Sequence, residues 1–482
     1  MAKGNINKAI DDLRDTIVGK IPLPNTQVEQ ITLALLYKFM DDMDNASISL
    51  GGNATFFAND YEKYSWKKIM SQNIGAQTRY NLYVEALEKF YVHPNLPDTF
   101  KSIFKNATVP YRDPETLTNF LKIIDKEFDY SDSEQLGDAY EYLLSILGSQ
   151  GDLGQFRTPR NIIDFIVEMV EAKKENTILD PACGTAGFLI SAYKYILRNN
   201  TDETEGDKLS FDEKKQILNN ICGYDIEPSM VKIAEMNLYL HGAAEPKIYE
   251  YDTLTMDEKW NDKYDCILAN PPFMTPKGGI KPHNRFGVKA NKAEVLFVDY
   301  IQNHLNINGR AGIIVPEGII FQTGKAYKDL RKNLIENSLV AVISLPNGIF
   351  NPYSPVKTSI LLLDKKLAKA KEDILFVELK NDGYTLGTQR KPIEGNEIPE
   401  IIKIFKDYKD GVNIDYDKAL IVSKERLLKD TYSLDINKYK EITIEKIEYE
   451  DPKVILKQIM EMEEEFQKGL KELGEMLKWN IK

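Results

Sequence analysis

The sequence predicts an α/β fold in three parts: a helical N-terminal domain (1–150), a doubly wound α/β domain (151–400) and a C-terminal extension (401–482). Apolar residues recur at helical spacing in the stretch 27–40 of the first part. Short β-branched and apolar runs alternate with helix-like stretches in the second part, as in a parallel sheet covered by helices. In the third part, apolar residues follow one another at intervals of three or four among Lys and Glu. This spacing predicts an amphipathic helix suited to packing on its own domain or to binding another chain, and we favour the partner.

Composition indicates a soluble globular protein. The chain has 482 residues, of which 43% are hydrophobic and 28% charged, so two or three units are expected. Neither a signal peptide nor an apolar run of membrane-spanning length is present, which predicts a cytoplasmic protein with no membrane association. Three cysteines fall in or beside expected core strands, and four scattered histidines form no ligand pattern. We therefore expect neither a disulfide framework nor a metal site.

Aromatic residues are frequent between Phe56 and Tyr91, where they interleave with lysines. Such a pattern suits either base stacking or a helical core, and core packing is the more common use of it. We expect these aromatic residues to form the core of the N-terminal domain.

A helix start is expected at Thr158, with Pro159 at the first helical position and an apolar-periodic stretch after it. The exposed N–H groups of such a start, together with Arg160, could bind an anionic group such as a carboxylate. A well-capped helix without any ligand is the alternative for these residues considered alone.

A glycine-bearing loop follows the first expected strand. The run 176–180 is β-branched and apolar and ends in Asp180, after which Gly184 and Gly187 precede a helix-like stretch. In a strand–glycine loop–helix unit, the backbone approaches a ligand closely and helix N–H groups point at it. The carboxylate of Asp180 could bind an ammonium group of that ligand.

Two further acids stand at strand ends. Asp225 ends the short run 221–225 and is placed to bind ribose hydroxyls, and Asp252 follows a third run and could accept from an adenine amino group. Ligands of parallel α/β sheets bind at the carboxyl ends of the strands. We therefore expect Asp180, Asp225 and Asp252 to share one edge.

The most specific motif is the turn Asn270-Pro271-Pro272-Phe273, which follows the strand-like run 264–268. The Asn270 side-chain oxygen and the Pro271 carbonyl could both accept from an NH2 group, drawing its nitrogen toward a tetrahedral geometry as it attacks a methyl sulfonium. The prolines stiffen the turn and remove competing N–H donors, while Phe273 offers a face for a planar base. A proline-rich turn after a buried strand is the alternative.

A basic segment follows this turn. Residues 275–293 contain no acid, are rich in Gly and Pro, and carry Lys277, Lys281, Arg285, Lys289 and Lys292. We expect a mobile loop that contacts phosphate groups. The net charge of −12 leaves the rest of the surface acidic, which predicts that a partner would supply most of the affinity for any polyanion.

Later buried strands are expected at 311–316, 339–345 and 358–363. Between the last two lie Phe350 and Tyr353, in a loop that could border a base pocket.

Three motifs together resemble those of the amino-group DNA methyltransferases of the gamma arrangement, specifically the modification (M) subunits of type I restriction-modification systems. They are a GQ-aromatic-x-TPR-like motif, a DPACGTGGFL-like loop and an NPPF turn, at 154–160, 180–189 and 270–273. The similarity extends over nearly the whole chain, including the stretch 135–144. Arg157 and Ala186 depart from the family pattern, in which an aromatic residue and a glycine are common.

This resemblance implies a Rossmann-like, S-adenosylmethionine-dependent methyltransferase domain that methylates adenine N6 in double-stranded DNA. It implies cofactor binding by two motif segments, consisting of Gln155, Phe156, Arg157, Thr158, Pro159 and Arg160 in the first and of Asp180, Gly184, Thr185, Ala186 and Gly187 in the second. A separate specificity (S) subunit would choose the target, in a complex of two M chains and one S, with restriction (R) subunits as a further component. Cytosine-N4 methylation, protein glutamine-N5 methylation and a non-catalytic scaffold subunit remain as alternatives.

Overall fold

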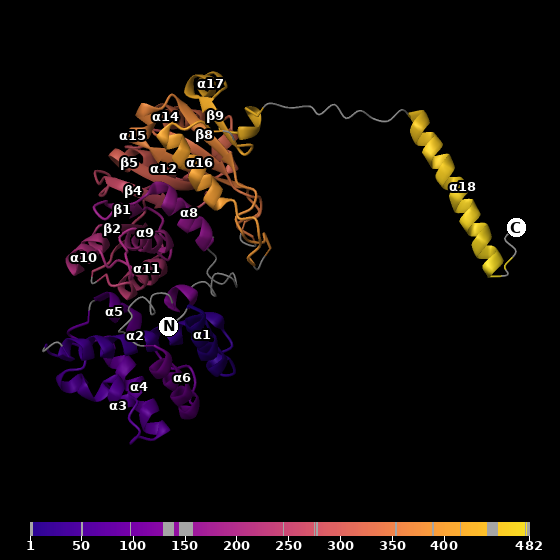
Figure 1. Ribbon diagram of the computed structural model, residues 1–482. Helices are drawn as coiled ribbons and strands as arrows, with labels where there is room; N and C mark the ends of the chain where they lie inside the picture. The colour runs from indigo at the N-terminus through magenta and orange to yellow at the C-terminus, as the bar shows by residue number, and fades with distance from the viewer. Residues whose placement is uncertain are drawn as a thin grey trace. The chain divides into compact units, whose positions relative to one another are not determined.

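The computed structural model describes residues 3–49, 52–96, 98–128, 139–143, 158–243, 245–273, 275, 278–351, 354–387, 390–414, 416–440, 452–477 and 479. Two compact units divide the chain, one over Met1–Tyr439 and the other over Lys440–Lys482 (Figure 1). The first unit holds both the N-terminal helices and an α/β sheet domain.

The N-terminal part is helical. Its elements are α1 (Lys3–Val18), α2 (Pro24–Ser49), the 3-10 helix η1 (Asn59–Tyr64), α3 (Trp66–Ile69), α4 (Ala76–Phe90), α5 (Asp98–Phe104) and α6 (Pro114–Glu127). Tyr37 lies fully buried at their centre, and its ring contacts Phe57, Trp66, Tyr83 and Phe90 at centroid distances of 4.7–5.8 Å. Most of the aromatic residues between Phe56 and Tyr91 are therefore core residues, as expected.

The N-terminal helices pack on the α/β domain through helix α11 (Pro228–Leu240). Tyr239 of α11 makes edge contacts with Phe39 and Phe100 of α2 and α5, at centroid distances of 5.5 and 4.1 Å. Because these side chains belong to the same apolar core as the N-terminal helices, the two parts form one unit.

A nine-stranded sheet forms the centre of the α/β domain, in the order β3-β2-β1-β4-β5-β7-β6-β8-β9. Its strands are β1 (Ile178–Asp180), β2 (Ile221–Asp225), β3 (Lys247–Glu250), β4 (Tyr264–Ala269), β5 (Leu305–Pro316), β6 (Leu339–Ser344), β7 (Thr358–Asp364), β8 (Asp373–Glu378) and β9 (Ala419–Ser423). Neighbours from β3 to β5 pair in parallel, and β7 runs antiparallel to both β5 and β6. Central strands such as β6 are buried along their whole length. Burial on both faces explains their nearly continuous β-branched and apolar sequences.

Two apolar layers cover the sheet. One contains α8 (Arg160–Val170), α9 (Gly187–Arg198), α10 (Phe211–Asn219), α11, α15 (Lys365–Ala370) and α16 (Ile398–Asp410). The other contains α12 (Ala293–His304), α13 (Glu317–Phe321), α14 (Lys325–Asn337), α17 (Lys424–Lys429) and the 3-10 helix η2 (Ile436–Lys438). Gly312 in β5 lets α8 approach the sheet closely, because an added Cβ would lie 2.3 Å from Cγ2 of Ile166.

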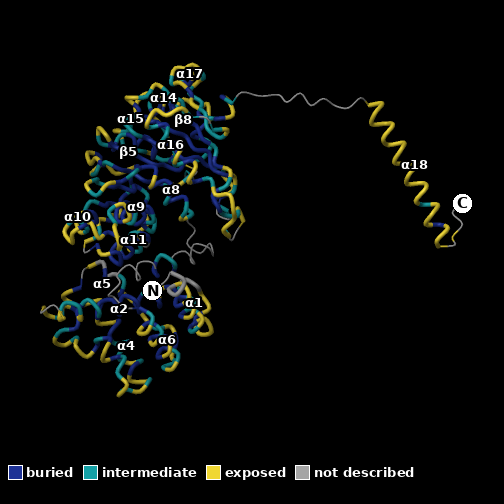
Figure 2. The backbone as a smooth tube through the Cα atoms, viewed as in Figure 1, coloured by how far each residue is buried: buried dark blue, intermediate teal, exposed yellow. Residues whose placement is uncertain are grey.

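The sheet extends beyond residue 400, where the sequence pattern placed a domain boundary. Strand β9 pairs with β8, and the break between compact units falls after Tyr439. In the second unit, α18 (Pro452–Met476) is an amphipathic helix whose apolar side chains, including Ile455, Ile459 and Phe466, are exposed (Figure 2). Among the described residues, no helix combines the length and the apolar character needed to cross a lipid bilayer.

Candidate functional site

The strand order places a topological switch point between β1 and β4. The chain runs outward from β1 through β2 to β3 and then returns to the other side of β1 with β4. Such a switch point, at the carboxyl ends of parallel strands, is where open α/β sheets bind ligands. Asp225 and Asp180 end β2 and β1, and Asn270 follows β4 directly, so three of the expected site residues lie on adjacent strands.

Asp180 is a buried acid at this edge. Its side chain is 1% exposed and accepts a hydrogen bond from the Ala182 N–H at 3.0 Å. Burial raises the pKa of Asp180 to about 8, and the neighbouring negative charge of Asp225 adds to the rise. A cation placed beside Asp180 would therefore be strongly favoured, because it would stabilise an otherwise costly carboxylate.

Asp225 fastens the glycine loop to the neighbouring strand. One carboxylate oxygen accepts from the Gly184 N–H at 2.9 Å, and the other accepts from the Glu227 N–H at 2.9 Å. Burial also raises the pKa of this carboxyl group. Each carboxylate oxygen has a second lone pair, so both can still accept a hydrogen bond from a ligand hydroxyl.

The loop between β1 and α9 has a strained, fixed backbone. Gly184 and Ala186 both adopt left-handed conformations, with φ of 51° and 66°. Only glycine adopts this conformation without a steric penalty. The left-handed backbone at Ala186 therefore explains why glycine is common at this position in the motif that the loop resembles. The Thr185 carbonyl accepts from Nδ2 of the buried Asn237 in α11 at 2.8 Å, and Gly187 begins α9.

The third acid, Asp252, is used locally in the structure. Its carboxylate caps the following turn by accepting from the N–H of Leu254 at 3.0 Å, and it also accepts from the hydroxyl of Thr255. Between them, the Thr253 hydroxyl donates to the Pro181 carbonyl at 2.8 Å and ties this turn to the loop after β1. Asp252 is thus joined to the loop that carries Asp180.

The side chain of Asn270 is held from one side. Its Nδ2 donates to Oγ1 of Thr158 at 2.8 Å, while its Oδ1 is buried and accepts no hydrogen bond from any described residue. Buried polar atoms in native proteins usually have a partner, and an exception needs an explanation. An oxygen acceptor left open at a ligand-binding edge is suited to an incoming amino group.

An aromatic pair flanks the turn. The Phe273 and Phe350 rings meet edge to face with centroids 6.1 Å apart, and Phe350 is buried. Phe350 thus lies beside the turn, and its expected place at the border of a base pocket stays a prediction, whereas Tyr353 lies outside the described residues. Pro271 is buried and Pro272 is exposed, so the first proline of the turn packs inside the protein and the second faces solvent.

Arg160 makes contacts within the protein. Its guanidinium pairs with Glu141 at 2.7 Å and with Asp164 at 3.2 Å, and Lys194 also pairs with Glu141 at 3.2 Å. These cations hold the pKa of the largely buried Glu141 at about 2, although burial acts in the opposite direction. Three further residues of the motif, Gln155, Phe156 and Arg157, lie outside the described part of the chain.

The described residues of the basic segment, 275 and 278–293, make contacts with neighbouring parts of the domain. The ends of the segment are joined by a hydrogen bond from the Ala293 N–H to the Thr275 hydroxyl at 3.0 Å, and the Gly287 N–H donates to Asp299 of α12 at 2.9 Å. Apolar residues of the segment pack beside Ala182 of the β1–α9 loop and Leu254 of the Asp252 turn. These contacts attach the described residues of the segment to α12 and to the loops that carry Ala182 and Leu254.

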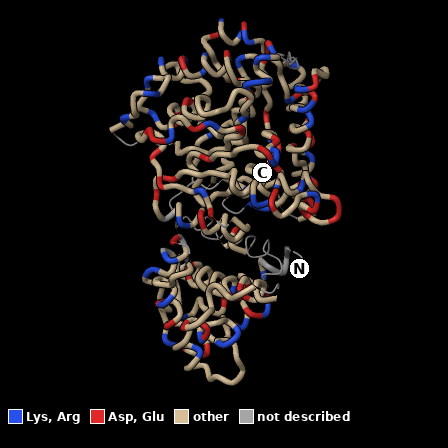
Figure 3. Tube along the Cα trace, turned by 90° about the vertical axis from the view of Figure 1, so that its left-hand side faces the viewer, with Lys and Arg blue, Asp and Glu red and all other residues tan. Residues whose placement is uncertain are grey.

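Four basic residues of the segment, Lys281, Arg285, Lys289 and Lys292, are exposed and form no ion pair within the described chain, while Lys277 lies outside it. Arg285 donates to Asn261 Oδ1 at 2.5 Å and lies over the Trp260 ring. Elsewhere acids and bases are interspersed (Figure 3). The acid-free segment thus presents positive charge next to this edge of the sheet.

Two residues at this edge of the sheet were missed by the sequence reasoning. Ile226 is 67% exposed although it follows Asp225 directly, and an apolar side chain there could cover the flat face of a bound base. Asn237 supports the β1–α9 loop from α11. A polar residue within the apolar stretch of α11 was the available signal for Asn237, but Ile226 had none, because its exposure is a tertiary property.

Comparisons with known proteins agree with this geometry. The family described as N-6 DNA Methylase has a model that matches residues 131–448. The chain is 32% identical over 291 residues to the type I restriction enzyme EcoEI methylase subunit of Escherichia coli, covering 58% of this chain and 57% of that protein. It is 29% identical over 324 residues to the EcoKI methylase subunit of Escherichia coli strain K12, covering 63% and 58%. Less than two thirds of either relative's length is therefore matched.

A solved structure resembles the fold as a whole. A chain from a study of complex assembly and conformational transition of the type I R-M system aligns with a TM-score of 0.71, 23% identity and 99% coverage of both chains. At that identity the likeness establishes the fold alone.

Proposed function

Because the chain belongs to the N-6 DNA methylase family, we propose that it transfers a methyl group from S-adenosylmethionine to N6 of an adenine in double-stranded DNA. It acts as the modification subunit of a type I restriction-modification complex. The observation that carries the proposal is the open, buried Oδ1 of Asn270 at the switch point of the sheet. An amino nitrogen is the group that this acceptor suits.

The acidic groups at this edge of the sheet match the positive charges of the cofactor. S-adenosylmethionine carries an ammonium and a sulfonium, and the raised pKa values of Asp180 and Asp225 mean that this edge lacks a positive partner. Asp180 would hold the ammonium side, Asp225 the ribose hydroxyls and Asp252 the adenine amino group, with Ile226 against the adenine ring. Gly184, Thr185, Ala186 and Gly187 provide the close backbone approach. When bound, the cofactor supplies an electrophilic methyl group.

The turn after β4 acts on the target base. Asn270 Oδ1 and the Pro271 carbonyl accept from the two N6 hydrogens, which concentrates the nitrogen lone pair and stabilises its developing positive charge. The adenine reaches them only after extrusion from the duplex, and Phe273 stacks on it in place of its former neighbours. The amine is itself the nucleophile, so no covalent bond to the protein is needed.

DNA binding is divided between this chain and a partner. Lys281, Arg285, Lys289 and Lys292 are exposed beside this edge of the sheet, and together with Lys277 they contact phosphates around the extruded base. The net charge of −12 makes the chain a poor DNA binder by itself. The specificity subunit supplies target choice and most affinity, and binds the apolar face of α18 in a complex of two M chains and one S. Restriction subunits join the complex in the cytoplasm.

The test compares modified bases across the source genome in the wild type and in a strain carrying Asn270→Ala. Loss of N6-methyladenine from a two-part target with an unspecified spacer is expected, since each half-site would be read by one domain of the partner. The exposed Asn337 on α14 gives a matched control, and Asn337→Ala should leave the pattern intact.

Two outcomes would overturn the proposal. If no DNA mark changes in the Asn270→Ala strain, the protein does not methylate DNA, and amide methylation of protein or a scaffold role takes its place. If N4-methylcytosine disappears instead, the methylated base is cytosine and not adenine.

Binding measurements separate the two halves of the site. Asn270→Ala should abolish turnover but change the dissociation constant of S-adenosylmethionine less than about threefold. Asp225→Ala should weaken cofactor binding at least about tenfold, because it removes the ribose acceptor and also releases the Gly184 N–H. Equal losses of cofactor binding in both variants would contradict the assigned roles.

A further inference from the structure

Thr158 and Asn270 are brought together by the fold from positions far apart in the chain. Nδ2 of Asn270 donates to Oγ1 of Thr158 at 2.8 Å. A carboxamide carries its nitrogen and its oxygen on opposite sides of one planar group, so a bond that fixes the nitrogen also decides where the oxygen points. In this arrangement, Oδ1 is left open.

The direction of this amide decides whether the turn can act on an amino group. With Oδ1 facing the base, the side chain accepts a hydrogen from N6. With the amide rotated by half a turn, Nδ2 would face N6, and two donors would oppose each other. Rotation would therefore remove the interaction without removing the residue.

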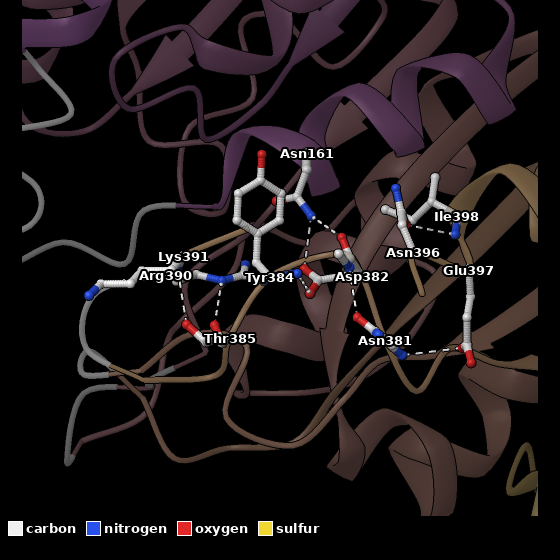
Figure 4. Close-up of polar contacts among 11 residues, drawn as sticks. Asn161, Asn381, Asp382, Tyr384, Thr385, Arg390, Lys391, Asn396, Glu397 and Ile398 are labelled. Carbon is white, nitrogen blue, oxygen red and sulfur yellow. Dashed lines mark hydrogen bonds and ion pairs between the residues drawn. The ribbon is translucent and has the colours of Figure 1, made fainter. Parts of the chain in front are cut away.

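Thr158 is itself held by the start of α8. The Pro159 carbonyl accepts from the N–H groups of Ile162 and Ile163, both at 3.0 Å, which fixes the first helical turn. Asn161 in that turn donates through Nδ2 to the Asp382 carbonyl at 3.0 Å and to its carboxylate at 2.8 Å (Figure 4). The position of Thr158 thus depends on a contact with a distant loop.

That loop, residues 380–397 between β8 and α16, is anchored by Asp382. The Asp382 side chain is fully buried and forms an ion pair with Arg390, whose guanidinium lies over the Tyr384 ring (Figure 4). Asn381 accepts from the Gly383 N–H at 2.9 Å and donates to the Glu394 carbonyl at 2.8 Å. These bonds join the two described parts of the loop, 380–387 and 390–397, to each other.

The same loop also braces the other side of the turn. Nδ2 of Asn351 donates to the Leu386 carbonyl at 3.2 Å. Its neighbour Phe350 packs against Phe273. One loop therefore supports both the residue that contacts Asn270 and the residue that contacts Phe273.

We propose that Thr158 is a positioning residue whose hydroxyl fixes the Asn270 carboxamide with its oxygen toward the substrate amino group, and that Asp382 maintains this arrangement through Asn161. The inference rests on the proposed function, because it assumes that an amino group meets Asn270. The expected helix start was one residue too early, because Pro159 is the N-cap of α8 and Arg160 is its first residue. The Thr158 hydroxyl therefore does not cap the helix but accepts from Asn270.

The experiment uses the full chain, purified with its co-eluting partner chains from the source cells, and compares Thr158→Val, Thr158→Ser and wild type. Val replaces the hydroxyl with a methyl group of similar size, so it removes the hydrogen bond with little change in volume. We expect kcat to fall about a hundredfold, as for a misplaced catalytic group, with the KM for S-adenosylmethionine changed less than about threefold. Thr158→Ser should recover most of the lost turnover.

A matched control and a second variant keep the test independent of folding. Thr16→Val on α1 also removes one hydroxyl hydrogen bond, to the Asp12 carbonyl, and should leave kcat unchanged. Asn161→Ala keeps the Thr158 side chain but removes the hydrogen bonds from Asn161 to Asp382 that hold the start of α8. This variant should lower kcat about tenfold and leave the KM for S-adenosylmethionine unchanged. Wild-type turnover in Thr158→Val or Asn161→Ala would overturn the proposal, as would equal losses in kcat and cofactor affinity.

The NH2 resonance of Asn270, observed in protein labelled with 15N at asparagine, tests the positioning without catalysis. The side-chain signal should shift and exchange with water faster in Thr158→Val than in wild type or Thr158→Ser. If wild type fails to methylate DNA, the proposed function fails, and this signal still decides the inference. An identical signal in wild type and Thr158→Val would refute the positioning role.

Discussion

The buried carboxyl group of Asp180 should make the free protein less stable as the pH rises. Burial raises the pKa of Asp180 to about 8, whereas an aspartate in an unfolded chain titrates near about 3.9. An acid with a raised folded-state pKa binds its proton more tightly in the folded protein. Stability is therefore lost progressively as the pH rises from about 4 toward 8.

The size of the effect follows from these two pKa values. Between pH 5 and pH 8, linkage gives a loss on the order of 4 kcal/mol in the free energy of unfolding. The unfolding entropy is about 2.1 cal/mol/K per residue, so a unit the size of Met1–Tyr439 should lose roughly 4 °C in Tm. Asp180→Asn removes the ionisation, and its side-chain oxygen can keep the hydrogen bond from Ala182 N–H.

The assay is thermal unfolding of wild type and Asp180→Asn at pH 5, 6, 7 and 8, without cofactor and at constant ionic strength. The Tm advantage of the variant should grow by roughly 4 °C over this range. Asp257→Asn, at an exposed position, is the matched control and should show no such growth. S-adenosylmethionine at about 100 times its Kd should add about 2.7 kcal/mol to wild type and little to Asp180→Asn.

A Tm difference that stays constant from pH 5 to pH 8 would refute the reasoning, because it would mean that Asp180 ionises in the folded protein as easily as in the unfolded chain. A variant as strongly stabilised by cofactor as wild type would refute only the assignment of Asp180 to the cationic side of the ligand.

Two further predictions concern packing and pairing. Gly312→Ala should destabilise the protein by about 1–3 kcal/mol in urea unfolding, because the added Cβ would lie 2.3 Å from Cγ2 of Ile166. In an Ile166→Ala background the same substitution should cost far less. Additive losses in the double variant would contradict the predicted clash. Asp382→Ala should cost about 3–5 kcal/mol, because it leaves the Arg390 charge without its buried partner. Glu425→Ala, which removes one partner of an exposed ion pair on α17, should cost far less than Asp382→Ala. Similar losses in the two variants would show that the Asp382 pair is not buried in solution.

The fold class and the site edge were predictable from local patterns. The α/β sheet and the helical N-terminal part follow from periodicity, because strand and helix repeats leave different spacings of apolar residues. Acids and an asparagine at the ends of apolar runs predicted a ligand-binding edge of the sheet, since the carboxyl ends of parallel strands meet at one edge. The sheet confirms this for Asp180, Asp225 and Asn270.

Contacts between distant segments could not be predicted in this way. Local spacing gave no signal that Thr158 contacts Asn270 or that Asp382 anchors α8, because each contact joins residues more than 100 positions apart. Local spacing also gave no signal for the contacts of the basic segment, in which Gly287 donates to Asp299 and apolar residues pack beside Ala182 and Leu254.

The sequence by itself determined which chemical groups this protein has and on which local elements they stand, because periodicity and turn chemistry act between near neighbours in the chain. Tertiary structure alone decided the burial that raises the pKa of Asp180, the exposure of Ile226 and the direction of the Asn270 amide. These properties depend on which atoms of distant segments surround a group, and packing of the whole domain sets that environment.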